Sequence, residues 1–423
     1  MIRRERPCSF ALTLALLLCA TNSTALAQHL ASPDQKGPYN VGAQLFNATM
    51  TGGRVARVQV FYPTLSPSDA GSSYTVNIVT GSYQIRSPLG AAHNSPIAPG
   101  AFPLVVHDHG GGPAGQDFQR LAQLPLHELM ASHGFIVVVA LHSGNEIDRV
   151  RDLPLVIDAC LARSSTVGDL FFQRIDAGRI GISGQSAGGS AALGAAGGLT
   201  AQGIAADARL KAMVVYEPAI LSMSDAQRIA IPYMVMGGLQ SPNGQAMPSL
   251  FGSTTLSTPR LYVQTARAVH QSYVTSLPDE IDQAREQALA ALGPGVEPLT
   301  TLIPANAAAA RAYTLWNNGA IMFPAFGPGF GGGRNLCDRV GLNSIRPLDL
   351  DGDGFTDSPP FLLDDPPYMP QRPIRAEVMI PMVKLYTVAF WKTRLEGDHR
   401  YQRYLAPGYA QSQNLEATVF VGE

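Results

Sequence analysis

The chain has little charge and little cysteine, and it lacks a run of basic residues beyond its first few positions. Charged residues make up 15% of its 423 residues, and 30 Lys and Arg are balanced by 32 Asp and Glu. Proteins that bind nucleic acid through its phosphates usually carry a clustered basic stripe. The sequence therefore predicts no nucleic-acid partner.

The N-terminal apolar run, Phe10–Ala20, is too short to span the roughly 30 Å hydrocarbon core of a membrane. It follows arginines within residues 3–6 and precedes Ala25–Ala27, a combination typical of a cleavable secretory signal. We expect a signal peptide over residues 1–27 and a secreted or periplasmic mature chain over residues 28–423 with no transmembrane segment. Cleavage would remove three basic residues and one acidic residue and leave a formal charge of −4.

Of the four cysteines, only Cys160 and Cys337 belong to the mature chain. In an oxidising compartment, two cysteines far apart in sequence are candidates for a disulfide. We expect a Cys160–Cys337 disulfide, and the alternative is two buried free thiols.

Short apolar segments alternate with segments of helical periodicity over much of the chain. This alternation predicts an α/β domain with a mostly parallel central sheet and helices on both faces. The expected strands are Val55–Tyr62, Phe102–Val106, Phe135–Leu141, Ile180–Ser183, Ala212–Tyr216, Tyr233–Met236 and Leu261–Thr265, and the expected crossover helices are Phe118–Ser132 and Ile147–Leu161.

The alternation ends after His270. Residues 275–375 combine Ala-rich stretches, a Gly-rich loop and many prolines, and we interpret them as an insertion or lid. Glu377–Tyr404 then regains helical periodicity and is expected to form the closing helix of the domain.

One serine stands between glycines directly after an expected strand, in the sequence Gly184-Gln185-Ser186-Ala187-Gly188. A G-x-S-x-G turn between strand and helix exposes the serine hydroxyl, and the first amides of the helix favour negative charge beside it. The pattern predicts Ser186 as a nucleophile and the Ala187 amide as one donor of an oxyanion hole. A Gly/Ser-rich turn without function is the alternative.

A second glycine-rich loop follows the strand that ends at Val106, with the sequence His107-Asp108-His109-Gly110-Gly111-Gly112. In esterases, a His-Gly loop at this point gives one backbone N–H to the oxyanion hole, and we expect Gly111 to be that donor. His107 and His109 could instead bind a metal, but no third ligand follows at a suitable spacing. A structural hydrogen bond made by His109 is the interpretation we favour.

A serine nucleophile needs an imidazole to take its proton and a carboxylate to orient that imidazole. In enzymes whose serine stands in a G-x-S-x-G turn of this kind, the acid and the histidine follow the serine in the chain. This order leaves His270 and His399 as candidates for the histidine. His270 comes shortly after an expected strand, whereas His399 lies among charged residues. For the acid we expect Glu217, at the end of a strand, with Asp225 in reserve and a capping role for Glu217 as the alternative.

Several segments match one group of enzymes in order along the chain. They are Gly37–Tyr39, Phe61–Thr64, Arg149–Asp158, Ile175–Gly181, Gly184–Gly189 and Val269–Tyr273. In these segments, roughly residues 37–273 plus the last helix, the sequence resembles the platelet-activating factor acetylhydrolase and dienelactone-hydrolase-like group of α/β-hydrolases. The resemblance implies an α/β-hydrolase fold, with Val269-His270-Gln271 around the catalytic histidine and the acid where Glu217 stands. The chain departs from the group in having Glu217 where aspartate is general and Gln185 where histidine is usual.

A separate acidic loop places carboxylates at its first, third, fifth and ninth positions and a glycine at its sixth. This spacing is typical of loops that wrap oxygen ligands around Ca²⁺. The twelfth position, usually an acid, is Pro360. The loop predicts a structural calcium site, with an acidic turn without metal as the alternative; its expected ligands are Asp349, Asp351, Asp353, Phe355 and Asp357.

Together these patterns predict a secreted serine carboxylesterase or lipase-like enzyme that uses Ser186, His270 and Glu217 and needs no cofactor for catalysis. The expected partner is a small-molecule, lipid or polymer ester. The alternatives are a polyester or amide hydrolase with the same triad, and a binding protein that kept the fold without the chemistry.

Overall fold

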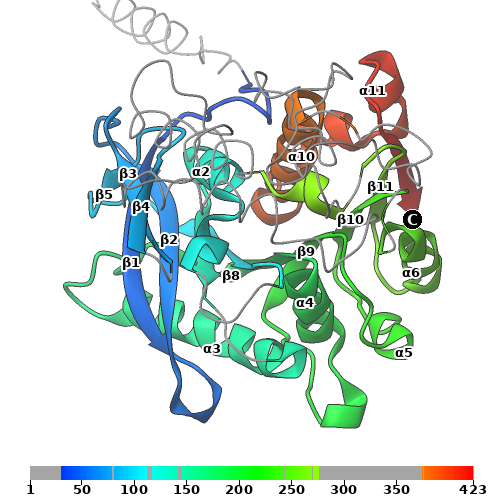
Figure 1. The fold of residues 1–423 in the computed structure, drawn as a ribbon, viewed down its shortest axis with the longest axis horizontal. Helices are drawn as coiled ribbons and strands as arrows, with labels where there is room; N and C mark the ends of the chain where they lie inside the picture. The colour runs from blue at the N-terminus through cyan, green and yellow to red at the C-terminus, as the bar shows by residue number, and fades with distance from the viewer. Residues whose placement is uncertain are drawn as a thin grey trace, which may run out of the picture.

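The computed structural model describes residues 30–78, 81–111, 117–141, 145–239, 241, 243–268, 270–275, 374 and 376–422. A ten-stranded sheet crosses this part of the chain in the order β12-β11-β10-β9-β8-β6-β7-β2-β1-β5 (Figure 1). The strands from β7 to β11 in this order are parallel. β2 and β12 join them antiparallel, one on each side, so the sheet is mixed but mostly parallel.

The strands are β1 (Asn40–Thr49), β2 (Val55–Thr64), β3 (Ser73–Ile78), β4 (Gly81–Arg86), β5 (Ala92–His93), β6 (Phe102–Asp108), β7 (Ile136–Ala140), β8 (Ile175–Gln185), β9 (Leu210–Tyr216), β10 (Tyr233–Gly238), β11 (Arg260–Thr265) and β12 (Thr418–Gly422). The α-helices are α2 (Leu124–Ser132), α3 (Glu146–Ser165), α4 (Ala187–Gly197), α5 (Met223–Ala226), α6 (Met247–Ser253), α10 (Ala376–Trp391) and α11 (Pro407–Ser412). Short 3₁₀ segments include η2 (Asp117–Leu121), η5 (His270–Tyr273) and η9 (His399–Leu405), and a π turn, η8, covers Lys392–Glu396.

Two apolar clusters cover the two faces of the sheet. α2 and α10 pack on one face, and α3 and α4 pack on the other (Figure 1). Because side chains alternate along a strand, Val105 belongs to the first cluster and Val106 to the second. All seven strands predicted from the sequence are present, and the predicted α/β class, with a mostly parallel sheet and helices on both faces, is confirmed.

The C-terminal part differs from its prediction. The expected helix over Glu377–Tyr404 ends as a regular helix at Trp391, passes through the π turn and stops at Gly397, whose φ of 74° is left-handed. The chain then forms η9 and α11 and ends in β12, which pairs antiparallel with β11. β12 gave no signal in the sequence because its pattern is largely exposed.

Cys160 is a buried free thiol on α3, and burial raises its pKa to about 12. Cys337, its expected disulfide partner, lies outside the described residues. So do the predicted signal peptide, nearly all of the insertion at 275–375 and the predicted calcium ligands Asp349–Asp357. No helix among the described residues combines the length and apolarity needed to cross a membrane.

Candidate functional site

The candidate site lies where five parallel strands end. β6, β8, β9, β10 and β11 run in one direction, so the segments that follow them meet at one edge of the sheet. Ligands of open α/β sheets bind at this edge. The structure places all five predicted catalytic and oxyanion residues there: Ser186, His270, Glu217, Gly111 and Ala187.

Ser186 stands at the corner between β8 and α4 with φ 57° and ψ −122°, a backbone conformation that is strained for a residue with a side chain. Glycine is required on both sides of it. A Cβ on Gly184 would lie 2.2 Å from the Gly188 carbonyl oxygen, and one on Gly188 would lie 2.1 Å from the Asp108 carbonyl oxygen. The backbones of β8, α4 and the glycine loop after β6 are therefore in direct contact at these two glycines. Ser186 itself remains partly exposed.

The glycine loop after β6 contacts this corner. A Cβ on Gly110 would lie 3.6 Å from Ser186 Cβ, and a Cβ on Gly111 would lie 3.6 Å from Ala187 Cβ. The two expected oxyanion donors, the amides of Gly111 and Ala187, thus belong to adjacent segments beside the serine.

A buried ion pair between Arg149 and Asp108 holds the glycine loop after β6 in place. The Arg149 guanidinium on α3 binds both carboxylate oxygens of Asp108, at 3.0 and 2.6 Å, and also donates to the His109 carbonyl. His109 Nδ1 lies 2.7 Å from the Gly110 carbonyl oxygen. The ion pair was not predicted from the sequence, although Asp108 lies within the His-Gly motif and Arg149 begins one of the segments that resemble the acetylhydrolase group.

Among the described residues, His107 and His109 make separate hydrogen bonds. His107 Nδ1 lies 2.9 Å from Ser183 Oγ, and burial lowers the pKa of His107 to about 4, so its ring is neutral near pH 7. Within the described ranges, no three His, Cys, Asp or Glu side chains are grouped to bind a metal ion.

His270 lies between two side chains from other strand ends. It begins η5 after β11 and is 2% exposed. Its Nδ1 is 3.6 Å from Glu217 Oε2, and its Nε2 is 3.4 Å from the Gln185 side-chain nitrogen. A hydrogen bond between Ser186 Oγ and His270 is not among the contacts of the described residues. Catalytic hydrogen bonds are often long in the absence of substrate and shorten in the substrate complex.

Glu217 is fully buried and has a positive φ of 48° at the turn after β9. Its Oε1 accepts a hydrogen bond from the Gly238 amide, and its Oε2 accepts one from Ser241 Oγ at 2.5 Å. The buried Tyr273 phenol lies close to this carboxylate; burial, and then the charge of Glu217, hold its pKa well above the ordinary value. Tyr273 is therefore a neutral neighbour of the site.

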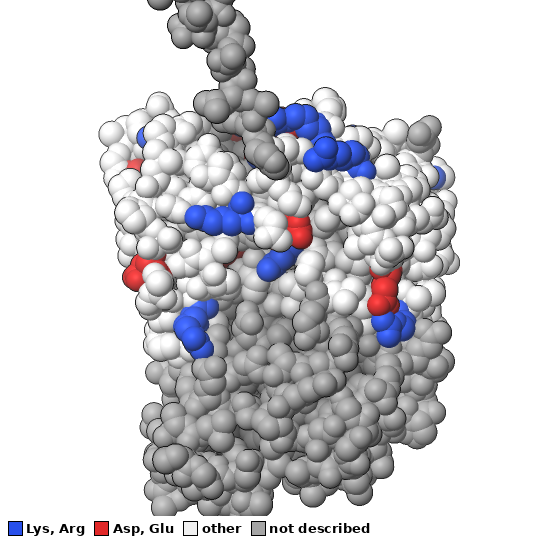
Figure 2. All heavy atoms as spheres, turned by 90° about the horizontal axis from the view of Figure 1, so that it is seen from above, with Lys and Arg blue, Asp and Glu red and all other residues white. Residues whose placement is uncertain are grey.

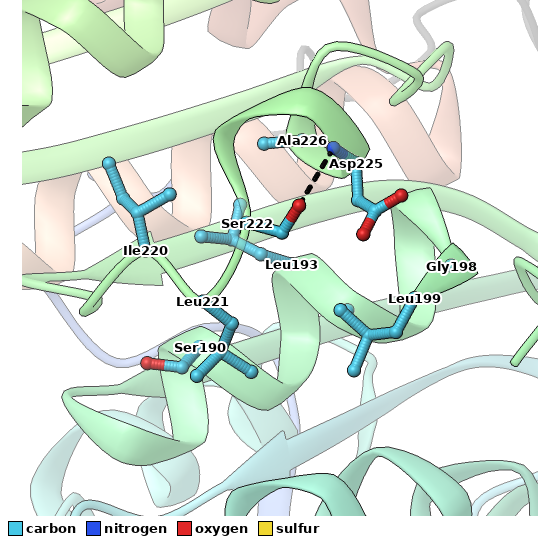
Figure 3. Close-up of a pocket in the computed structure, with 10 residues that line it drawn as sticks. Ser190, Leu193, Gly198, Leu199, Ile220, Leu221, Ser222, Asp225 and Ala226 are labelled. Atoms are coloured by element: carbon cyan, nitrogen blue, oxygen red, sulfur yellow. Dashed lines mark hydrogen bonds between the residues drawn. The ribbon is translucent and has the colours of Figure 1, made fainter. Parts of the chain in front are cut away.

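Asp225, the reserve candidate for the acid, has other partners. It lies beside Ser222, Leu199 and Ala226 along a shallow pocket between α4 and α5 (Figure 3). Its carboxylate accepts from Thr200 Oγ1 at 2.5 Å and lies 3.4 Å from Arg228, while its amide donates to Ser222 Oγ at 3.2 Å. These contacts cap α5 and join it to Thr200, which lies three residues after the end of α4. His399 is exposed on η9.

Charged side chains are sparse on the face shown in Figure 2. Lys and Arg lie singly or in pairs among uncharged surface, some of them beside Asp or Glu. The described part of this face has no continuous basic stripe.

A known structure that this chain resembles shares its fold but little of its sequence. No protein-family model and no curated protein sequence matches the chain. Among solved structures, it is similar to a ferulic acid esterase from Streptomyces cinnamoneus, with a TM-score of 0.52 and 16% sequence identity over 90% of this chain and 96% of that one. At this identity the similarity concerns the fold. The mostly parallel sheet, the helices on both faces and this structural neighbour establish that the chain has an α/β-hydrolase fold.

Proposed function

We propose that this protein is a secreted serine hydrolase that cleaves carboxylic esters through an acyl-enzyme intermediate. The observation that carries the proposal is the meeting of three segments: the strained Ser186 corner, the glycine loop against it, and His270 3.6 Å from the buried Glu217. The structural neighbour is a ferulic acid esterase, which supports an ester as the substrate class.

Each proposed role follows from position. Ser186 Oγ attacks the ester carbonyl carbon while His270 Nε2 takes its proton. Glu217 faces Nδ1, keeps the proton on that nitrogen and stabilises the imidazolium that forms. The carbonyl oxygen becomes an oxyanion bound by the Gly111 and Ala187 amides. His270 then protonates the leaving alcohol. Water, activated by the same imidazole, hydrolyses the acyl-enzyme and releases the acid.

The direct test is turnover of a short p-nitrophenyl ester by Ser186→Ala. Because removal of a triad member abolishes both proton transfer and acyl-enzyme formation, we expect kcat to fall by roughly 10⁴-fold or more in folded protein. Ser165→Ala, an exposed serine on α3, is the matched control and should retain wild-type turnover. Wild-type turnover by Ser186→Ala would refute the proposal.

A fluorophosphonate probe separates an enzyme from a binding protein with the same fold. Only an activated serine reacts readily with the probe, so the wild-type protein should be labelled at Ser186. Absence of labelling would favour the non-catalytic alternative. A panel of ester, polyester and amide substrates would then separate the remaining alternatives.

A further inference from the structure

The loop after β10 does not supply the acid, although this position often does so in hydrolases of this fold. Its sequence from residue 237 to 243 is Gly-Gly-Leu-Gln-Ser-Pro-Asn and contains no carboxylate. In the structure the same loop contacts Glu217, which follows the neighbouring strand β9. Described residues of this segment thus bind an acid that follows another strand.

Three hydrogen bonds join the loop to Glu217. Ser241 Oγ donates to Oε2 at 2.5 Å, the Gly238 amide donates to Oε1, and Asn243 Nδ2 donates to the Glu217 backbone carbonyl at 3.0 Å. Both oxygens of the carboxylate and its backbone are therefore bound. The oxygen bound by Ser241 is also the one that faces His270 Nδ1, at 3.6 Å.

The contact is tight and buried. Glu217 and Ser241 are both fully buried. A Cβ on Gly244 would lie 1.8 Å from the Gly238 carbonyl oxygen and 2.9 Å from Glu217 Oε1, so the loop can close around the carboxylate only with glycine at position 244. Hydrogen bonds to a buried carboxylate are stronger than those between neutral groups.

Glutamate needs such support more than aspartate does. Its side chain has one more rotatable bond, so the position of its carboxylate is less determined by the backbone. A donor that fixes Oε2 restricts this rotation and keeps that oxygen directed at the imidazole. Positioning of this kind is how a supporting side chain raises the rate of a proton-transfer step.

We propose that Ser241 is a positioning residue of the reaction, which acts through Glu217 by fixing the oxygen that faces His270. The inference rests on the proposed function. It predicts an effect on kcat with little effect on KM, because Ser241 contacts the acid and not the substrate. It also predicts that the effect requires Glu217.

The test is a double-mutant cycle with a p-nitrophenyl ester. Ser241→Ala should lower kcat about tenfold and change KM by less than about twofold, whereas Ser241→Thr, which keeps the hydroxyl, should retain most of the activity. In a Glu217→Gln background, Ser241→Ala should change kcat by less than about twofold, since the carboxylate that it positions is gone. Ser241→Cys, with similar volume and a weaker donor, gives the same comparison if the alanine variant does not fold.

Ser257→Ala is the matched control. Ser257 is equally buried and donates one hydrogen bond, to the Ile231 carbonyl at 2.5 Å, away from Glu217. It should leave kcat unchanged while lowering stability. An unchanged kcat in Ser241→Ala, or a tenfold loss that persists in the Glu217→Gln background, would overturn the inference while fluorophosphonate labelling of Ser186 still supported the proposed function. Failure of wild-type labelling would overturn both.

Discussion

At the scale of single residues, a substitution at Gly110 should lower activity while leaving stability nearly unchanged. A Cβ there would lie 2.2 Å from Gln185 Oε1, the end of the side chain that contacts His270. Gly110→Ala should displace this side chain and the imidazole beside it. We expect kcat/KM to fall at least about tenfold, with the free energy of unfolding changed by less than about 1 kcal/mol, because the obstructing atom ends a flexible side chain. Ester kinetics and urea unfolding measure the two quantities.

Gly252→Ala is the control for this substitution, since a Cβ on Gly252 meets no described atom within 4 Å. It should be fully active and slightly more stable, because alanine favours the helix α6. A Gly110→Ala variant with wild-type kcat/KM would show that Gln185 can move without disturbing His270.

The residues of the candidate site differ in how visible they are in the sequence. Ser186, Gly111 and Ala187 stand in short motifs whose local spacing predicts their geometry. Choosing Glu217 and His270 required the order of the strands as well. The contacts of Gln185 and Ser241 could not be predicted, because they depend on which way side chains point across three different strand ends.

At the scale of elements, the Arg149–Asp108 pair joins α3 to the end of β6. Asp108 is fully buried and Arg149 nearly so. Removing one partner of a buried pair leaves an uncompensated charge, so Arg149→Met should lower the free energy of unfolding by about 3–5 kcal/mol. Urea denaturation with linear extrapolation measures this loss.

The exposed pair between Arg267 and Glu416 provides the comparison. Its side chains are 34% and 37% exposed, and exposed pairs contribute little. Glu416→Gln should therefore cost less than about 1 kcal/mol. Equal losses in Arg149→Met and Glu416→Gln would contradict a special role for the buried pair.

Elements at the centre of the sheet were predictable and those at its edges were not. β6 and β7 are buried along their whole length, so their apolar runs are continuous. β1 and β12 lie near the two edges and mix buried with exposed positions, which weakens their pattern. The helix after the predicted insertion ends earlier than expected because the π turn over Lys392–Glu396 and the left-handed Gly397 interrupt it.

At the scale of the whole molecule, three buried neutral histidines make stability depend on pH. Burial lowers the pKa of His107 and of His133 to about 4 and holds that of His127 well below the ordinary value of 6.5. The unfolded chain binds protons at these sites below pH 6.5, whereas folded His107 and His133 do so only near pH 4 and folded His127 only well below pH 6.5. These histidines therefore leave the free energy of unfolding unchanged above pH 6.5, and they lower it progressively as the pH falls from 6.5 toward 4.

We expect the free energy of unfolding to be lower at pH 5 than at pH 7.5. His107 and His133 together contribute on the order of 4 kcal/mol to this loss, since each accounts for about 1.4 kcal/mol per pH unit between pH 6.5 and 5, and His127 adds to it. Glu128 and Glu396, whose pKa values burial raises, bind protons more readily in the folded than in the unfolded state and so oppose this loss. Urea unfolding at the two pH values measures the difference.

His127→Phe tests the cause of this difference. The centroid of the His127 ring lies 4.6 Å from that of His107 and 5.7 Å from that of Phe61. Neither nitrogen of His127 has a hydrogen-bond partner among the described residues, so phenylalanine can replace it in the core. This variant should lose less stability between pH 7.5 and pH 5 than the wild-type protein does. His399→Gln, at an exposed site, should leave the difference unchanged. If His127→Phe lost as much as the wild-type protein, His127 would not be a source of the acid sensitivity.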